Sequence, residues 1–155
     1  MTLLIGAALL IVMGLGWAIF FSAKEAWAIV AMDLVMLVVG IAITVLTQCK
    51  HTRFAFFLLV ISMFFVICGV SLLLDVPSAQ APRSTHNFLL VLALAALVFL
   101  RDDSPAMRFS VTGICCVGFV VLASWPVGID TAYVLPEGMR VWGTWVNNTF
   151  AALGL

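Results

Sequence analysis

The sequence predicts an all-α protein, a polytopic integral membrane bundle of helices, from two features. Of the 155 residues, 65% belong to the apolar set AVILMFWYC, the mean hydropathy is +1.28, and only 9% are charged, against about 25% in ordinary soluble domains. The apolar residues also form runs of about 20 residues, the length with which an α-helix crosses a bilayer. A chain of this length accommodates one domain, so we expect residues 1–155 to form a single transmembrane unit.

The remaining composition excludes several other classes. Seven Lys and Arg balance seven Asp and Glu, so the formal net charge is zero and no basic field is present to attract a nucleic acid. The high apolar content also excludes a disordered chain. No C-x-x-C pair occurs among the four cysteines, so we expect neither a zinc site nor a thiol redox motif, and no cofactor.

Short polar links delimit the first three predicted spans. The first run, 2–23, ends at a Lys-Glu pair, the second, 26–47, ends at the polar stretch 48–53, and the third covers 54–74. So short a link between the first two runs predicts an antiparallel helical hairpin.

Three further runs follow at 85–100, 105–124 and 137–155. The uninterrupted apolar part of the first reaches only about 21 Å, so its helix is expected to begin near Ser84 or Thr85, either of which can act as the N-cap. Ser104 and Pro105 suit the N-cap and first turn of the fifth helix. The apolar part of the last run spans about 22 Å, less than the hydrocarbon core of about 30 Å, so we predict five full spans and a sixth that is truncated.

The distribution of Lys and Arg favours a cytoplasmic amino terminus. The loops 48–53 and 101–108 are short and carry four of these residues, whereas the connections on the other side are longer and carry three. By the positive-inside rule, the first side is expected to be cytoplasmic.

Asp33 is the one acidic residue inside an unbroken apolar run, about 12 Å into the second predicted helix. A carboxylate at this depth is expected to face the interior of the bundle. Two interpretations remain open: a ligand contact or proton-linked switch, or a structural hydrogen bond near the interface.

A second group of polar residues is expected together on the outer face. Arg83 or Arg140 is suited to bind the carboxylate of a small polar or amphipathic ligand, while a solvated rim is the alternative. In the last predicted helix, and apart from this outer-face group, Asn147 and Asn148 are expected to hydrogen-bond across helices and fix their register. Other members of this group are Asp75, His86, Asn87, Asp130, Tyr133 and Glu137. The ligand-binding or sensing candidates are therefore Asp33, Asp75, Arg83, His86, Arg140 and Asn147.

Three segments together resemble a known family: DVPSAQAPRSTHN at 75–87, LRDD at 100–103 and LPEGMRVWGTWVNN at 135–148. The chain resembles, over most of its length, the six-helix membrane sensor regions that precede bacterial diguanylate cyclases of the GGDEF type, class III adenylate cyclases and some sensor histidine kinases. In that family the helices form a receptor-like domain, commonly dimeric, whose last helix continues into a cytoplasmic linker and output domain. The resemblance implies a multi-pass protein of the bacterial inner membrane, with Arg83, His86 and Asn147 at polar positions of the pattern.

From this resemblance we expect a signal-input domain that regulates a cytoplasmic nucleotide cyclase or histidine kinase and forms a homodimer in the bilayer. The sequence contains no phosphate-binding glycine loop and no nucleophile cluster, so the segment itself is not expected to be catalytic. The alternatives are an accessory or structural subunit of a membrane complex and a small transporter subunit. A membrane enzyme is less favoured, because His51 and His86 are expected on opposite sides.

Overall fold

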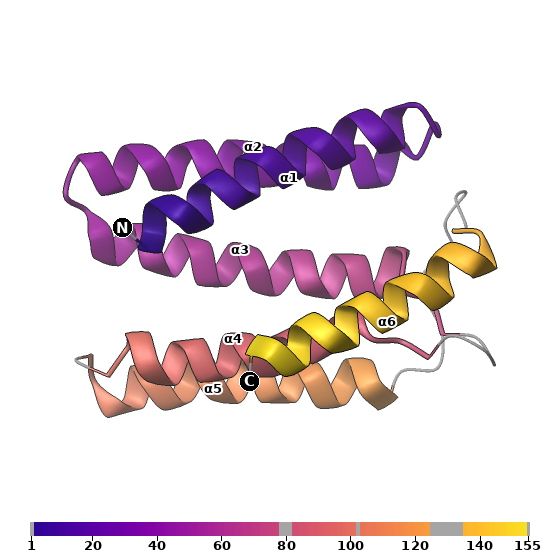
Figure 1. The fold of residues 1–155 in the computed structure, drawn as a ribbon. Helices are drawn as coiled ribbons and strands as arrows, with labels where there is room; N and C mark the ends of the chain where they lie inside the picture. Colours follow the sequence, from indigo (N-terminus) through magenta and orange to yellow (C-terminus); the bar gives the residue numbers. More distant parts are fainter. Residues whose placement is uncertain (1, 78–81, 102, 125–134, 155) are drawn as a thin grey trace. The chain divides into compact units, whose positions relative to one another are not determined.

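The computed structural model describes residues 2–77, 82–101, 103–124 and 135–154, and the regular structure within these ranges is entirely helical. Figure 1 shows the helices in chain order. They are α1 (Thr2–Ser22), α2 (Trp27–Gln48), α3 (Thr52–Leu73), the 3₁₀ turn η1 (Thr85–Asn87), α4 (Phe88–Phe99), α5 (Pro105–Ser124) and α6 (Glu137–Gly154). The predicted all-α class is confirmed for the described residues.

Four of these helices, α1, α2, α3 and α5, are long and apolar enough to cross a bilayer. The five full spans predicted from the sequence are not confirmed. The expected span 85–100 is divided between η1 and α4, which has 12 residues and is therefore about 18 Å long. Although α6 has 18 residues, it is not among the four, since it carries Glu137, Arg140 and adjacent asparagines.

The chain divides into two compact units, Met1–Val66 and Ile67–Leu155. Helix α3 begins in the first unit and ends in the second. Each unit has its own helical hairpin, α1–α2 in the first and α4–α5 in the second. The single functional domain expected from the sequence stays a prediction.

In the first unit, α1 and α2 form the predicted antiparallel hairpin (Figure 1). A Cβ at Gly14 would lie 2.7 Å from the main-chain oxygen of Asp33, and one at Gly40 would lie 2.9 Å from that of Ala7. The two helix backbones therefore approach each other more closely than residues with a Cβ would allow at these positions. The core of the unit contains Ala7, Leu10, Met36, Ile43 and Ala55.

In the second unit, the fifth helix begins as the sequence predicts. Pro105 is the first residue of α5, and Oγ of Ser104 accepts a hydrogen bond from the main-chain N–H of Met107, 3.3 Å away. Pro at the first helical position has no N–H to leave unpaired, and Ser satisfies one of the free donors behind it. At the other end of the hairpin, η1 contacts α4, α5 and α6.

Candidate functional site

Five of the six candidate residues lie together in the second unit, around η1. We call this group the η1 cluster. It comprises Asp75, Arg83, Ser84, Thr85, His86 and Asn87 from the segment between α3 and α4, and Arg140, Thr144, Asn147 and Asn148 from α6. Asp33 belongs to the first unit. Asp130 and Tyr133, also expected in this group, lie outside the described residues.

Asp75 caps η1 from a distant position in the sequence. Its Oδ2 accepts hydrogen bonds from the main-chain N–H groups of Ser84 at 2.7 Å and Thr85 at 2.5 Å, and from the Ser84 hydroxyl at 3.4 Å. Ser84 is the N-cap residue of η1, as the sequence predicts, but its own side chain makes no capping bond, and the carboxylate of Asp75 binds the free N–H groups instead. A carboxylate is the stronger acceptor at a helix amino terminus, where its charge also meets the positive end of the helix dipole.

Arg83 is a buried cation that closes the end of α5. Its Nη1 donates to the main-chain oxygen of Leu122 at 2.7 Å, one of the last carbonyls of α5, which have no partner within their helix. Its Nε donates to the main-chain oxygen of Asp75 at 3.1 Å. Arg83 is only 8% exposed, and this burial lowers the pKa of its guanidinium, an effect that the Asp75 charge opposes. Both of these bonds are to main-chain carbonyls, and the expected role of Arg83 in binding a ligand carboxylate stays a prediction.

His86 lies in η1, outside the four long apolar helices, with its ring stacked on Phe119 of α5. The ring centroids are 5.1 Å apart and the planes differ by 25°. The residue is 8% exposed, and its buried Nδ1 has no hydrogen-bond partner among the residues that the structure describes. Burial lowers the pKa of His86, while the nearby charge of Asp75 raises it and that of Arg83 lowers it. The balance favours a neutral imidazole.

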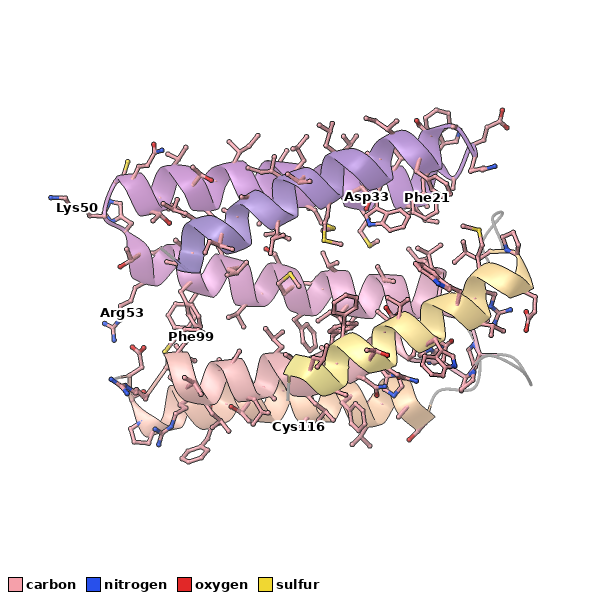
Figure 2. All side chains as sticks on the ribbon, viewed as in Figure 1. Phe21, Asp33, Lys50, Arg53, Phe99 and Cys116 are labelled. Carbon is pink, nitrogen blue, oxygen red and sulfur yellow. The ribbon has the colours of Figure 1, made fainter. Side chains whose placement is uncertain are left out.

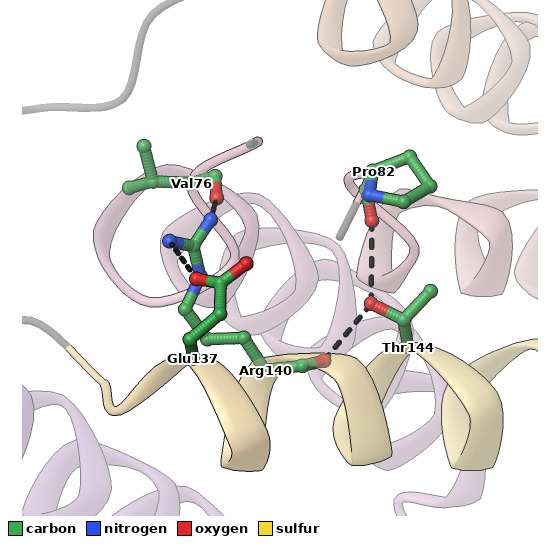
Figure 3. Close-up of polar contacts among 5 residues, drawn as sticks. All are labelled: Val76, Pro82, Glu137, Arg140 and Thr144. Carbon is green, nitrogen blue, oxygen red and sulfur yellow. Dashed lines mark hydrogen bonds and ion pairs between the residues drawn. The ribbon is translucent and has the colours of Figure 1, made fainter. Parts of the chain in front are cut away.

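The first turns of α6 bind the segment that follows α3 (Figure 3). Arg140 donates through Nη2 to the main-chain oxygen of Val76 and through Nη1 to Oε2 of Glu137 at 3.3 Å. One turn later, the hydroxyl of Thr144 lies 3.3 Å from the main-chain oxygen of Pro82 and 3.0 Å from that of Arg140.

The middle of α6 binds η1 itself. Nδ2 of Asn147 lies 3.2 Å from Oγ of Ser84 and 3.0 Å from Oγ1 of Thr85. The next residue, Asn148, accepts through Oδ1 from Nδ2 of Asn87 at 2.8 Å. The expectation that Asn147 hydrogen-bonds to another helix is thus met by contacts to η1. Positions 140, 144, 147 and 148 share one face of a helix, so α6 presents its polar stripe to the protein.

The opposite face of α6 is apolar and exposed. Trp145 is 75% exposed and Leu153 is 78% exposed. Val141, Trp142 and Phe150 are also exposed on this helix. This distribution is the reverse of that on a surface helix of a soluble protein, where the apolar stripe faces inward. It suits a helix whose outer face meets lipid and whose polar side chains face other protein groups.

Asp33 lies on α2 in the first unit (Figure 2). It is 3% exposed, and its Oδ2 has no hydrogen-bond partner among the described residues. The expected orientation toward the interior is therefore observed. Neither of the two interpretations, a ligand or proton site and a structural hydrogen bond, gains a contact from the structure.

Two members of the site, Thr144 and Phe119, were not predicted from the sequence. The signal for Thr144 was present in the spacing, because Arg140, Thr144 and Asn147 recur at intervals of about one helical turn. Within the described ranges, no group of three or more His, Cys, Asp or Glu side chains could hold a metal ion. Comparisons of the chain with known protein families, with curated proteins and with solved structures found no match.

Proposed function

We propose that this chain is a membrane-embedded signal-input unit in which the docking of α6 on the η1 cluster is the regulated step. The observation that carries the proposal is the chemistry of that docking: Arg140, Thr144, Asn147 and Asn148 attach α6 through hydrogen bonds. Each such bond contributes about 0.5–1.5 kcal/mol net, because water or a ligand can replace it. Bonds of this kind can be exchanged for bonds to water or to a ligand, which is what a switch between a docked and an undocked α6 requires.

The register of the docking supports a membrane position for α6. Residue numbers increase in the same direction along α6 and along the segment on which it packs. Arg140 bonds to Val76, Thr144 to Pro82, and Asn148 to Asn87. Helix α6 thus runs parallel to the direction of η1 and α4, and both helices enter the bilayer from the same side. Together with the four long apolar helices α1, α2, α3 and α5, we propose a six-helix arrangement in the bacterial inner membrane, with the cytoplasmic amino terminus that the distribution of Lys and Arg favours.

The mechanism is a shift of population between the two positions of α6. A small polar or amphipathic ligand at the outer face that binds the undocked form about 100-fold more tightly shifts the equilibrium by about 2.7 kcal/mol. In a homodimer, the movement of α6 changes the separation or rotation of two attached output domains. Nucleotide cyclases and histidine kinases are outputs of this kind, and the sequence resemblance favours them.

The test is a fusion of residues 1–155 to a diguanylate cyclase catalytic domain that is active only as a correctly arranged dimer. Asn147→Ala removes the contacts of α6 to Ser84 and Thr85. Thr149→Ala is the matched control, because the Thr149 hydroxyl bonds within α6, to the main-chain oxygen of Trp145 at 2.9 Å. We expect a severalfold change in cyclase activity for Asn147→Ala and none for Thr149→Ala. Equal activity of the unsubstituted fusion, Asn147→Ala and Thr149→Ala, at equal amounts of protein in the membrane, would contradict the proposal.

An accessory subunit of a larger complex is the second candidate, favoured by the exposed aromatic face that includes Trp142 and Trp145. A partner helix can cover such a face as lipid does. The two candidates differ in their state after extraction in mild detergent. The signal-input unit is expected as a stable homodimer, whereas an accessory subunit is expected as a monomer that requires its partner.

A further inference from the structure

From the surroundings of His86, we propose that the η1 cluster is a proton-operated latch: protonation of His86 loosens η1 and releases α6. This deepens the proposed function by naming the proton as a stimulus, and it rests on that function only for the step from α6 to an output. Three features of the structure support this latch: the buried ring of His86, the charges that face it, and the position of His86 between two residues that hold α6.

Protonation of the His86 ring is unfavourable in the position that the ring occupies. It is stacked on Phe119, and its Nδ1 is buried without a hydrogen-bond partner among the described side chains and main chain. A proton added at Nδ1 would create a buried charged donor without an acceptor. Such a group is strongly unfavourable, so the ring must move toward water or toward a new acceptor when it becomes charged.

The charged groups around the ring limit where it can move. From the segment before η1, Asp75 attracts an imidazolium and Arg83 repels it. Oδ2 of Asp75 already accepts from the N–H groups of Ser84 and Thr85, so an imidazolium that binds it competes with the cap of η1. On α6, Arg140 pairs with Glu137.

The other elements packed on η1 add few titratable groups. Helix α4, FLLVLALAALVF, has none. Helix α5 presents Phe119 to the ring, with the buried thiol of Cys115 one turn before it. Neither α4 nor α5 therefore supplies a carboxylate that could pair with a charged His86.

The neighbours of His86 connect its movement to α6. Thr85 accepts from Asn147 at 3.0 Å, and Asn87 donates to Asn148 at 2.8 Å. A displacement of η1 by the charged ring therefore disturbs both contacts at once. The sign follows from linkage. Since burial lowers the pKa of His86 below its ordinary value of 6.5, the docked state is fully favoured above about pH 6.5 and is weakened progressively as the pH falls below it.

The test uses the full chain in lipid nanodiscs and compares hydrogen exchange of the amides of η1 and of residues 140–148 at pH 7.5 and 5.0, corrected for intrinsic rates. The chain has two histidines, His51 and His86, so His51→Gln is the matched control for His86→Gln. We expect exchange in the wild type and in His51→Gln to rise severalfold at pH 5.0, because the docked state with a buried neutral ring is disfavoured once His86 becomes charged. His86→Gln is expected to show no such rise. A wild type without pH dependence, or a His86→Gln variant with the full rise, would overturn the proposal.

A second measurement keeps the test decisive if His86→Gln does not fold. Nuclear magnetic resonance of the wild type labelled at histidine resolves the imidazole rings, and a comparison with His51→Gln identifies the signals of His86. The midpoint for the release of α6 should coincide with the titration of His86, and a release midpoint that differs from it would overturn the proposal. If acid releases α6 but a cyclase fusion does not respond to Asn147→Ala, the latch stands and the proposed function fails. If the fusion responds to Asn147→Ala but exchange of the α6 amides is independent of pH, the proposed function stands and the latch fails.

Discussion

The side-chain amide of Asn147 joins α6 to η1, with Nδ2 lying 3.0 Å from Oγ1 of Thr85, a residue 62 positions earlier in the chain. The same amide lies 3.2 Å from Oγ of Ser84. Both hydroxyl-bearing residues have their main-chain N–H groups bound by Asp75. One carboxylate and one amide thus fix the two sides of the same turn, and the position of α6 depends on how well that turn is held.

Asp75→Asn is expected to loosen η1. The substitution keeps an oxygen acceptor but removes the negative charge that faces the main-chain N–H groups of Ser84 and Thr85. Loss of a charged cap costs about 1 kcal/mol, within a range of about 0.5–2. Exchange of the amides of η1 should accelerate about fivefold. Glu25→Gln, in the turn between α1 and α2, is the control and should leave these amides unchanged.

Thr144→Ala and Thr149→Ala form a matched pair on one helix. Both hydroxyls bond to a carbonyl four residues earlier, but only Thr144 also bonds to Pro82. Thr144→Ala is expected to weaken the docking of α6 by about 0.5–1.5 kcal/mol, measured as faster exchange of the amides of residues 140–148. If Thr149→Ala has the same effect, the bond to Pro82 does not hold α6.

Gly14→Ala and Gly16→Ala test the close contact of α1 with α2. A Cβ at Gly14 would lie 2.7 Å from the main-chain oxygen of Asp33, whereas one at Gly16 meets nothing within 4 Å. Gly14→Ala should therefore separate the helices and destabilise the hairpin by about 1–3 kcal/mol, as overpacking does. Gly16→Ala should be neutral or stabilising by up to about 1 kcal/mol, because Ala favours the helix. Thermal unfolding in detergent with the same lipid content measures both.

Arg83→Met is expected to detach the segment before η1 from the end of α5. The change keeps an apolar stem of similar length and leaves the carbonyl of Leu122 without its donor. A buried hydrogen bond to a charged group contributes about 1.5–3 kcal/mol, so exchange near Leu122 should increase markedly. Lys24→Gln, an exposed cation in the first unit, should have no effect there. A stable α5 terminus in Arg83→Met would contradict the role assigned to Arg83.

Local rules predicted the helices and some of their ends. Ser104 and Pro105 predicted the start of α5, because an N-cap residue and a first-turn proline act on their immediate neighbours. The polar residues near η1 were expected on one side because loops that alternate between helices alternate between membrane faces. Asp75, Arg83 and His86 are therefore predictable as neighbours, but their hydrogen-bond and stacking partners are not.

The partners depend on tertiary structure that no local pattern contains. Asp75 binds N–H groups 9 and 10 residues later, so the path of the chain between them decides which residue caps η1. The stacking of His86 on Phe119 depends in the same way on how α5 packs. The polar stripe of α6 was visible in the spacing of Arg140, Thr144 and Asn147, but an amphipathic pattern alone does not say which face meets protein and which meets lipid.

The most direct test of the docking of α6 on η1 is a double-mutant cycle between Asn147→Ala and Thr85→Val, with exchange of the α6 amides in nanodiscs at pH 7.5 as the measurement. Because the two side chains share one hydrogen bond, the effects of the single substitutions should not add, and a coupling free energy of about 0.5–1.5 kcal/mol is predicted. Strictly additive effects would show that Asn147 and Thr85 do not interact, and would contradict the docking on which the account depends.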